Sequence, residues 1–204
     1  LSRLSDRFKL LRSQGRYQSS RQATLRGAID WSWDLLQPPD QSTLAQLSVF
    51  RGGCSLEAAE SVVDVDDEES ELWVLDVVEN LVDHSLLRRV EPLPGQVRYQ
   101  MLESIREYAA EKLGESEAAT SLRHARFFAS FGEEDRVTSL TTHGGAGRLK
   151  GLALEFENLR AGVDSALRVS ETEVATGCAL AALEVIRRRG PIPVGIELTE
   201  RLLG

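Results

Sequence analysis

The sequence predicts a mainly α-helical protein that contains one small β-hairpin. Apolar residues recur at three- and four-residue spacings along most of the 204 residues, which is the pattern of helices packed on one side. The main β-type pattern is two short runs, residues 86–91 and 96–101, that flank a Pro/Gly turn. Hydrophobic residues make up 42% and charged residues 27% of the chain, the balance of an ordinary globular protein.

The segment before the hairpin predicts several short helices. A helix is expected to end before Pro38, because proline cannot continue it. Ser55 and Ser70 are the expected N-caps of two later helices. The expected helices cover residues 21–36, 41–50, 56–63 and 71–85. In the last of them, the side chains expected to point inward are Leu72, Leu75, Val78 and Val82.

A further helix is expected after the hairpin, over residues 103–113, with Gly114 as its C-cap glycine. Helices, a small hairpin and one more helix follow each other in this order in a winged-helix domain. Residues 71–85 would be its third helix and residues 86–101 its wing. The rest of the chain, from residue 116, predicts only helices.

The C-terminal helices are expected over residues 117–131, 149–167 and 173–189, with a last one beginning near Pro193. A glycine-rich stretch, residues 143–147, is interpreted as a flexible linker between the first two. Helices rich in small residues at their expected crossings predict a helical repeat array.

No catalytic or metal-binding pattern is found in the sequence. A phosphate-binding loop of the form Gly-x-x-x-x-Gly-Lys-Ser/Thr is missing. The histidines are dispersed, and Cys54 and Cys178 are far apart in the sequence. The sequence therefore predicts that this chain is not an enzyme and holds no metal.

The charge pattern argues against DNA binding. The formal net charge is -8, and the expected third helix contains Glu71, Asp76, Glu79 and Asp83 but no Lys or Arg. Contacts to phosphates need cations. The expected wing offers three, Arg88, Arg89 and Arg98.

Five ordered segments resemble the bacterial STAND class of signalling ATPases, which includes NB-ARC-type regulators. The resemblance covers nearly the whole chain and lies in residues 21–36, 47–60, 81–87, 98–109 and 155–162. It implies that residues 1–19 are the tail of a helical subdomain of an ATPase module. Residues 20–115 would be the winged-helix domain, and residues 116–204 the start of tetratricopeptide-like repeats.

The resemblance also implies a site. Relatives carry a Met-His-Asp motif where this chain has Met101, Leu102 and Glu103, and their histidine contacts the ADP phosphate. Leu102 cannot donate that hydrogen bond. Arg106, one turn further on, is either a substitute or the partner of a surface salt bridge with Glu103 or Glu107.

The leading hypothesis is a regulatory and interaction fragment of a multidomain STAND ATPase, a bacterial transcriptional regulator or signalling sensor. The parent would bind ATP or ADP, its ATPase core would contact the winged helix, and the repeats would bind a protein or small-molecule effector. The alternative is a free-standing winged-helix DNA-binding transcription factor. A cytoplasmic location without membrane contact is expected, since no apolar run approaches the roughly 20 residues of a membrane span.

Overall fold

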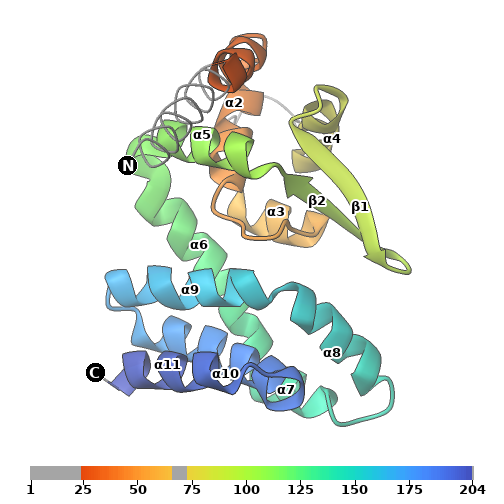
Figure 1. Ribbon diagram of the computed structural model, residues 1–204, viewed down its shortest axis with the longest axis vertical. Helices are drawn as coiled ribbons and strands as arrows, with labels where there is room; N and C mark the ends of the chain where they lie inside the picture. The colour runs from red at the N-terminus through yellow and green to blue at the C-terminus, as the bar shows by residue number, and fades with distance from the viewer. Residues whose placement is uncertain (1–23, 66–72, 204) are drawn as a thin grey trace, which may run out of the picture.

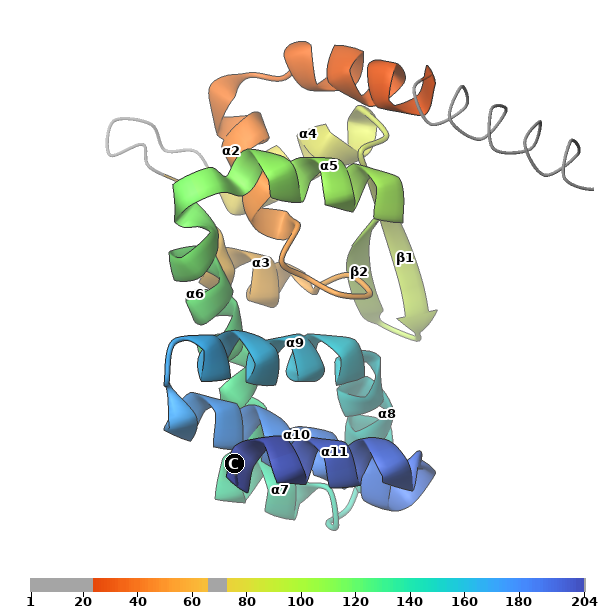
Figure 2. The same cartoon turned by 60° about the vertical axis from the view of Figure 1, so that its left-hand side comes forward.

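The computed structural model describes residues 24–65 and 73–203, which form two stacked parts (Figure 1). The winged helix contains the described residues up to Leu113, and the helical region begins at Gly114. Helix α6 runs from the winged helix down into the helical region (Figures 1 and 2). Residues 1–19, expected to be the tail of a helical subdomain, lie outside the described part of the chain.

The winged helix has the predicted order of elements. A helix over residues 24–34 precedes α2 (Pro38–Leu47), α3 (Leu56–Val62) and α4 (Val74–Asp83). The strands β1 (Leu87–Leu93) and β2 (Gln96–Met101) pair in antiparallel fashion, and α5 (Glu103–Leu113) follows. This confirms the predicted fold class, a winged helix with a small hairpin followed by helices.

Local interactions explain two of these boundaries. The Ser55 hydroxyl accepts a hydrogen bond from the backbone N–H of Ala58 at 3.2 Å, so Ser55 is the predicted N-cap of α3. Gly114 ends α5 with a φ of 54°, a conformation that glycine adopts without steric cost.

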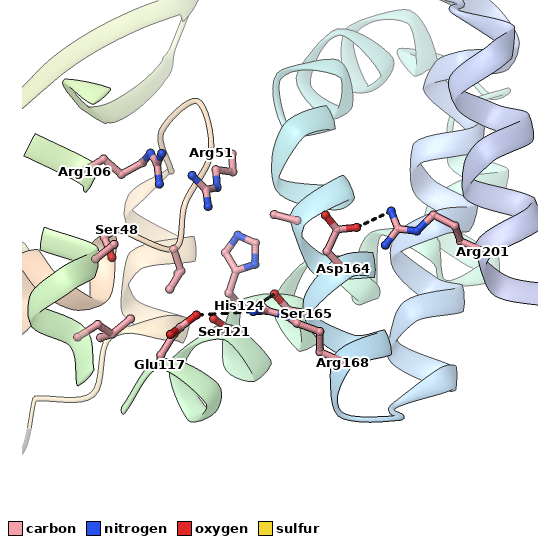
Figure 3. A pocket seen from close by; sticks show the side chains of 14 residues that line it. Ser48, Arg51, Arg106, Glu117, Ser121, His124, Asp164, Ser165, Arg168 and Arg201 are labelled. Atoms are coloured by element: carbon pink, nitrogen blue, oxygen red, sulfur yellow. Dashed lines mark hydrogen bonds and ion pairs between the residues drawn. The ribbon is translucent and has the colours of Figure 1, made fainter. Parts of the chain in front are cut away.

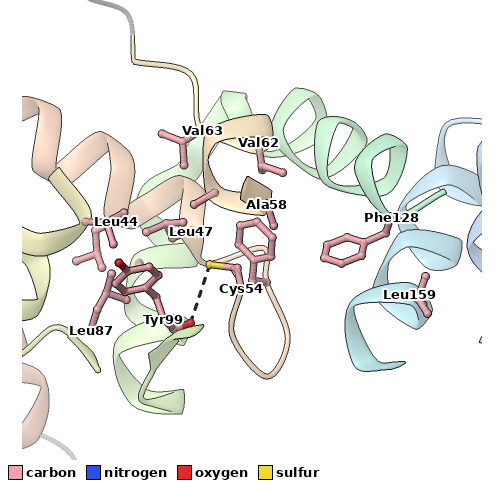
Figure 4. Packing of buried hydrophobic residues seen from close by; sticks show 14 of the residues in the cluster. Leu44, Leu47, Cys54, Ala58, Val62, Val63, Leu87, Tyr99, Phe128 and Leu159 are labelled. Atoms are coloured by element: carbon pink, nitrogen blue, oxygen red, sulfur yellow. Dashed lines mark hydrogen bonds between the residues drawn. The ribbon is translucent and has the colours of Figure 1, made fainter. Parts of the chain in front are cut away.

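The core of the winged helix lies between α2, α3, α4 and the hairpin. Leu44, Leu47, Val62 and Leu87 are buried there, together with the ring of Tyr99 (Figure 4). The Tyr99 hydroxyl donates to Glu79 at 2.8 Å, which ties β2 to α4. Backbone hydrogen bonds in both directions between Cys54 and Tyr99 attach the loop before α3 to β2.

The prediction for α4 was partly wrong. The helix begins at Val74, with Trp73 as N-cap; the expected start at residue 71, the Ser70 cap and Leu72 lie outside the described residues. Its buried face consists of Val77, Val78 and Leu81, whereas Leu75 is 39% exposed. Both α2 and β1 contact α4, and Val77, Val78 and Leu81 are the side chains that this packing buries.

The helical region contains α6 (Glu117–Ala129), α7 (Glu134–Ser139), α8 (Gly145–Leu154), α9 (Phe156–Arg168), α10 (Thr172–Arg189) and α11 (Ile192–Leu203). The single helix expected over residues 149–167 is in fact two helices that meet at Glu155. The glycine-rich stretch is not a linker throughout, since α8 already begins within it. Gly144 precedes α8 with a φ of 77°.

Small residues allow α10 to lie close to its neighbours. Ala175, Cys178, Ala179 and Ala182 are buried on its packed face. A Cβ atom added to Gly177 would lie 2.8 Å from the carbonyl oxygen of Ala129, closer than real Cβ contacts. The small residues seen in the sequence therefore do lie at helix crossings. A tetratricopeptide-like repeat remains an expectation from the resemblance.

Candidate functional site

A buried ion pair joins the winged helix to the helical region. Arg98 on β2 forms a two-pronged salt bridge with Glu155, the residue between α8 and α9. The same guanidinium donates to the backbone carbonyl of Gly53 at 2.8 Å. The Arg98 and Glu155 side chains are only 5% and 11% exposed. Arg98 therefore cannot contact an external phosphate, and its predicted availability on the wing was wrong.

Asn158 on α9 completes this interface. Its Oδ1 atom accepts from the backbone N–H of Arg51 at 2.6 Å, and its Nδ2 atom donates to the Gly53 carbonyl at 3.0 Å and to Glu155 at 2.8 Å. The residue is fully buried. A buried amide whose donor and acceptor atoms are all bonded fixes the orientation of the groups around it. Asn158 thus sets the position of the loop before α3 against α9.

An aromatic cluster lies beside Asn158. His124 on α6 is 1% exposed and packs between Phe50 and Phe128, with ring centroids 5.1 and 4.7 Å away. Its Nε2 atom is 3.3 Å from Asn158 Oδ1. Burial lowers the pKa of His124 to about 4, so the ring is neutral at pH 7.

Next to this interface is a cleft of about 560 Å³ between the two parts (Figure 3). Arg51 and Arg106 line it from the winged helix, and Arg168 and Arg201 from α9 and α11. Each of the latter two has a carboxylate partner: Arg201 lies 2.7 Å from Asp164, and Arg168 lies 3.6 Å from Glu117. Hence both parts of the chain contribute cations to one cavity.

The structure places the residues singled out by the resemblance at the junction of β2 and α5. Met101 is half-buried at the end of β2, Leu102 is the exposed N-cap of α5, and Glu103 begins the helix. Arg106 forms the predicted salt bridge with Glu103, which lowers the pKa of that carboxyl. Of these four residues, Arg106 is the one that lines the cleft.

The surface expected to meet DNA in a winged helix is acidic here. On α4, Asp76 and Asp83 are exposed, and the helix contains no Lys or Arg. Arg88 and Arg89 are exposed on β1. Among the described helices, none is long and apolar enough to cross a membrane.

Residues 36–114 match the family model of the winged helix-turn-helix domain. A putative HTH-type transcriptional regulator of Mycobacterium tuberculosis is 38% identical over 160 residues, which cover 78% of this chain and 18% of that protein. A Mycobacterium bovis protein of the same description matches with the same values. An uncharacterized M. tuberculosis protein is 34% identical over 122 residues, or 60% of this chain and 31% of that protein.

These matches connect the chain to regulators that carry a helix-turn-helix. The chain spans less than a fifth of the length of the two mycobacterial regulators. No solved structure matches. The winged-helix prediction is confirmed, and the alternative hypothesis, a winged-helix transcription factor, is supported better than the ATPase-linked one. The match to helix-turn-helix regulators counts against the expectation that DNA is not a partner of this chain.

Sequence reasoning missed the interface between the two parts. Arg98 and the segment around Glu155 and Asn158 were both within the motifs of the resemblance, but nothing in the sequence showed that they meet. Glu155 lies at helical spacing from two apolar residues of the stripe, three residues after Leu152 and four before Leu159. A carboxylate on the apolar face of a helix indicates a buried cationic partner, because buried charges are nearly always paired.

Proposed function

We propose that this chain is a regulatory module of a transcriptional regulator, and that its winged helix contacts protein rather than DNA. The relatives named as HTH-type transcriptional regulators support the first half of the proposal. The observation that carries the second half is the solvent face of α4, which presents Asp76 and Asp83 with no cation on the helix. Phosphate groups repel such a face.

Two further observations support a protein contact. Trp73 and Leu75 are 69% and 39% exposed at the start of α4. Large apolar side chains at a surface, and tryptophan above all, are enriched where proteins bind one another. In addition, Arg98 of the hairpin is buried in its ion pair with Glu155 and is not available to an external phosphate.

Direct DNA binding through the wing is the second candidate. Arg88 and Arg89 are exposed on β1, and the family match covers the whole hairpin. Two adjacent arginines can contact one or two phosphates, which gives a weak and strongly salt-dependent interaction. This candidate fits the comparisons, while the protein-contact proposal fits the charge of α4.

Fluorescence anisotropy with labelled random duplex DNA in about 20 mM salt separates the two candidates. We expect no saturable binding at micromolar protein. A matched pair of variants sharpens the test: Arg88→Gln with Arg89→Gln removes the two exposed cations of β1, whereas Asp76→Asn with Asp83→Asn removes the two exposed carboxylates of α4. Binding by the unaltered chain that is lost in the arginine variant would refute the protein-contact proposal and establish the wing as a DNA contact.

A nucleotide-linked parent is a separate proposal that rests on the resemblance alone. In it, the winged helix contacts an ATPase core and holds it inactive until an effector binds the helical region. Sequencing the coding DNA upstream of Leu1 tests it. A Gly-x-x-x-x-Gly-Lys-Ser/Thr motif after a predicted strand would support it, and an upstream segment without such a motif would rule it out.

A further inference from the structure

The cleft between the two parts has an excess of cationic side chains. Four arginines line it, and the carboxylates among its lining residues are Glu117 and Asp164. These two pair with Arg168 and Arg201. On the winged-helix wall, Arg106 pairs with Glu103, a carboxylate that is not among the residues lining the cleft.

Arg51 is the least compensated of the four. Among the residues that the structure describes, no carboxylate lies within ion-pair distance of its guanidinium, while Arg106 has Glu103. Burial lowers the pKa of Arg51, and the nearby Arg106 lowers it further. Two neighbouring guanidiniums that repel each other are stabilised by an anion placed between them. Figure 3 shows both side chains extending toward the same part of the cleft.

We propose that this cleft binds a small phosphorylated molecule, whose phosphate group is held by Arg51 and Arg106. Guanidinium groups bind phosphate oxygens through paired, charge-assisted hydrogen bonds. A cavity of about 560 Å³ is in the size range of small-molecule sites and is too small for a duplex. Leu102, where the resemblance placed a nucleotide-sensing histidine, is not among the residues that line it.

Because the cleft lies between the two parts of the chain, a ligand bound in it would affect how they are arranged. Arg51 and Arg106 belong to the winged helix, while Arg168 and Arg201 belong to α9 and α11. A polyanion that reaches both walls would bridge the two parts and stabilise their present arrangement over any other. This holds whether the surface of the winged helix meets protein or DNA, so the proposal stands apart from the function proposed above.

Isothermal titration calorimetry with inorganic pyrophosphate at low salt tests the proposal. We expect saturable binding to the unaltered chain. Arg51→Gln should weaken this binding about tenfold or more, because the loss of a charge-assisted hydrogen bond lowers affinity by at least about that factor. Asp164→Asn should have the opposite effect, because it removes a carboxylate that competes with the ligand for Arg201. Arg89 is exposed on β1 and is not among the residues that line the cleft, so Arg89→Gln is the matched control and should bind as the unaltered chain does.

Two results would overturn the proposal. One is the absence of saturable binding at millimolar pyrophosphate. The other is equal weakening by Arg51→Gln and Arg89→Gln, which would show general attraction to surface charge. Circular dichroism of each variant checks that the fold is kept. We expect Arg51→Gln to keep it, because the hydrogen bond from Arg51 to Asn158 is donated by the backbone N–H and not by the side chain.

Discussion

At the scale of single residues, the ion pair of Arg98 and Glu155 should be the most sensitive polar contact. Replacing one partner leaves the other charge buried without compensation, which costs several kcal/mol. We expect Glu155→Ala to lower the free energy of unfolding by about 3 kcal/mol. Urea denaturation followed by circular dichroism measures this loss.

The control for this variant lies two residues further along the chain, in α9. Glu157 pairs with Arg160 at 3.4 Å, and both side chains are well exposed. Exposed pairs of this kind contribute less than about 1 kcal/mol. If Glu157→Ala proved as costly as Glu155→Ala, burial of the ion pair would not be the reason for the loss.

His124 should make the stability of the fold dependent on pH. Its pKa is about 4 in the folded chain and about 6.5 when the chain is unfolded. Between these values the unfolded chain binds more protons, so the free energy of unfolding falls as the pH falls from about 6.5 to 4. The total loss from this one residue is about 3 kcal/mol.

His124→Leu isolates this contribution. The variant removes the titrating ring and leaves Asn158 its hydrogen bonds to Arg51, Gly53 and Glu155. Denaturation series at pH 7.5, 6 and 5 should show a shallower pH dependence for the variant. Parallel curves for the two proteins would mean that the pKa of His124 is the same in the folded and the unfolded chain.

At the scale of helices and strands, sequence patterns predicted the elements better than their contacts. The helices of the winged helix, the hairpin, the Ser55 cap and the Gly114 terminus follow from local rules on capping, turns and spacing. The buried face of α4 and the break at Glu155 depend on which neighbour packs there, which spacing alone does not contain. The cleft could not be predicted, because Arg51, Arg106 and Arg168 come together only in the folded chain.

The crossing of α10 over the turn after α6 offers a test at this scale. A Cβ atom added to Gly132 would overlap the backbone carbonyl of Gly177, and neither backbone can withdraw easily. We expect Gly132→Ala to lower the free energy of unfolding by about 2 kcal/mol, as overpacking of a core does. Thermal unfolding followed by circular dichroism would measure it.

Gly147→Ala serves as the matched substitution for this crossing. Gly147 lies in α8, and nothing lies within 4 Å of an added Cβ atom. Alanine favours a helix over glycine by up to about 1 kcal/mol, so this variant should be neutral or slightly stabilised. Equal destabilisation by both substitutions would contradict the close approach of the two backbones.

At the scale of the whole molecule, the winged helix and the helical region share one core. One large cluster of buried side chains extends from Ile29 to Leu198. Phe128 of α6 and Leu159 of α9 continue the packing that begins at Ala58 and Val62 in the winged helix (Figure 4). The buried polar contacts of Arg98 and Asn158 join the same two parts. A regulatory motion between them would therefore have to break a packed, hydrogen-bonded interface.

This shared core predicts that the chain unfolds in one cooperative step. Calorimetry should give a single transition whose van't Hoff and calorimetric enthalpies agree. Replacing both Glu155 and Asn158 by alanine removes the polar contacts to Arg98 and Gly53 and leaves the aromatic packing at Phe128. We expect the double variant to melt at a lower temperature with a broader or divided transition, because the two parts are then less strongly coupled. Two separate transitions in the unaltered chain would instead mean that the winged helix and the helical region fold independently, and that the interface stabilises their arrangement without coupling their unfolding.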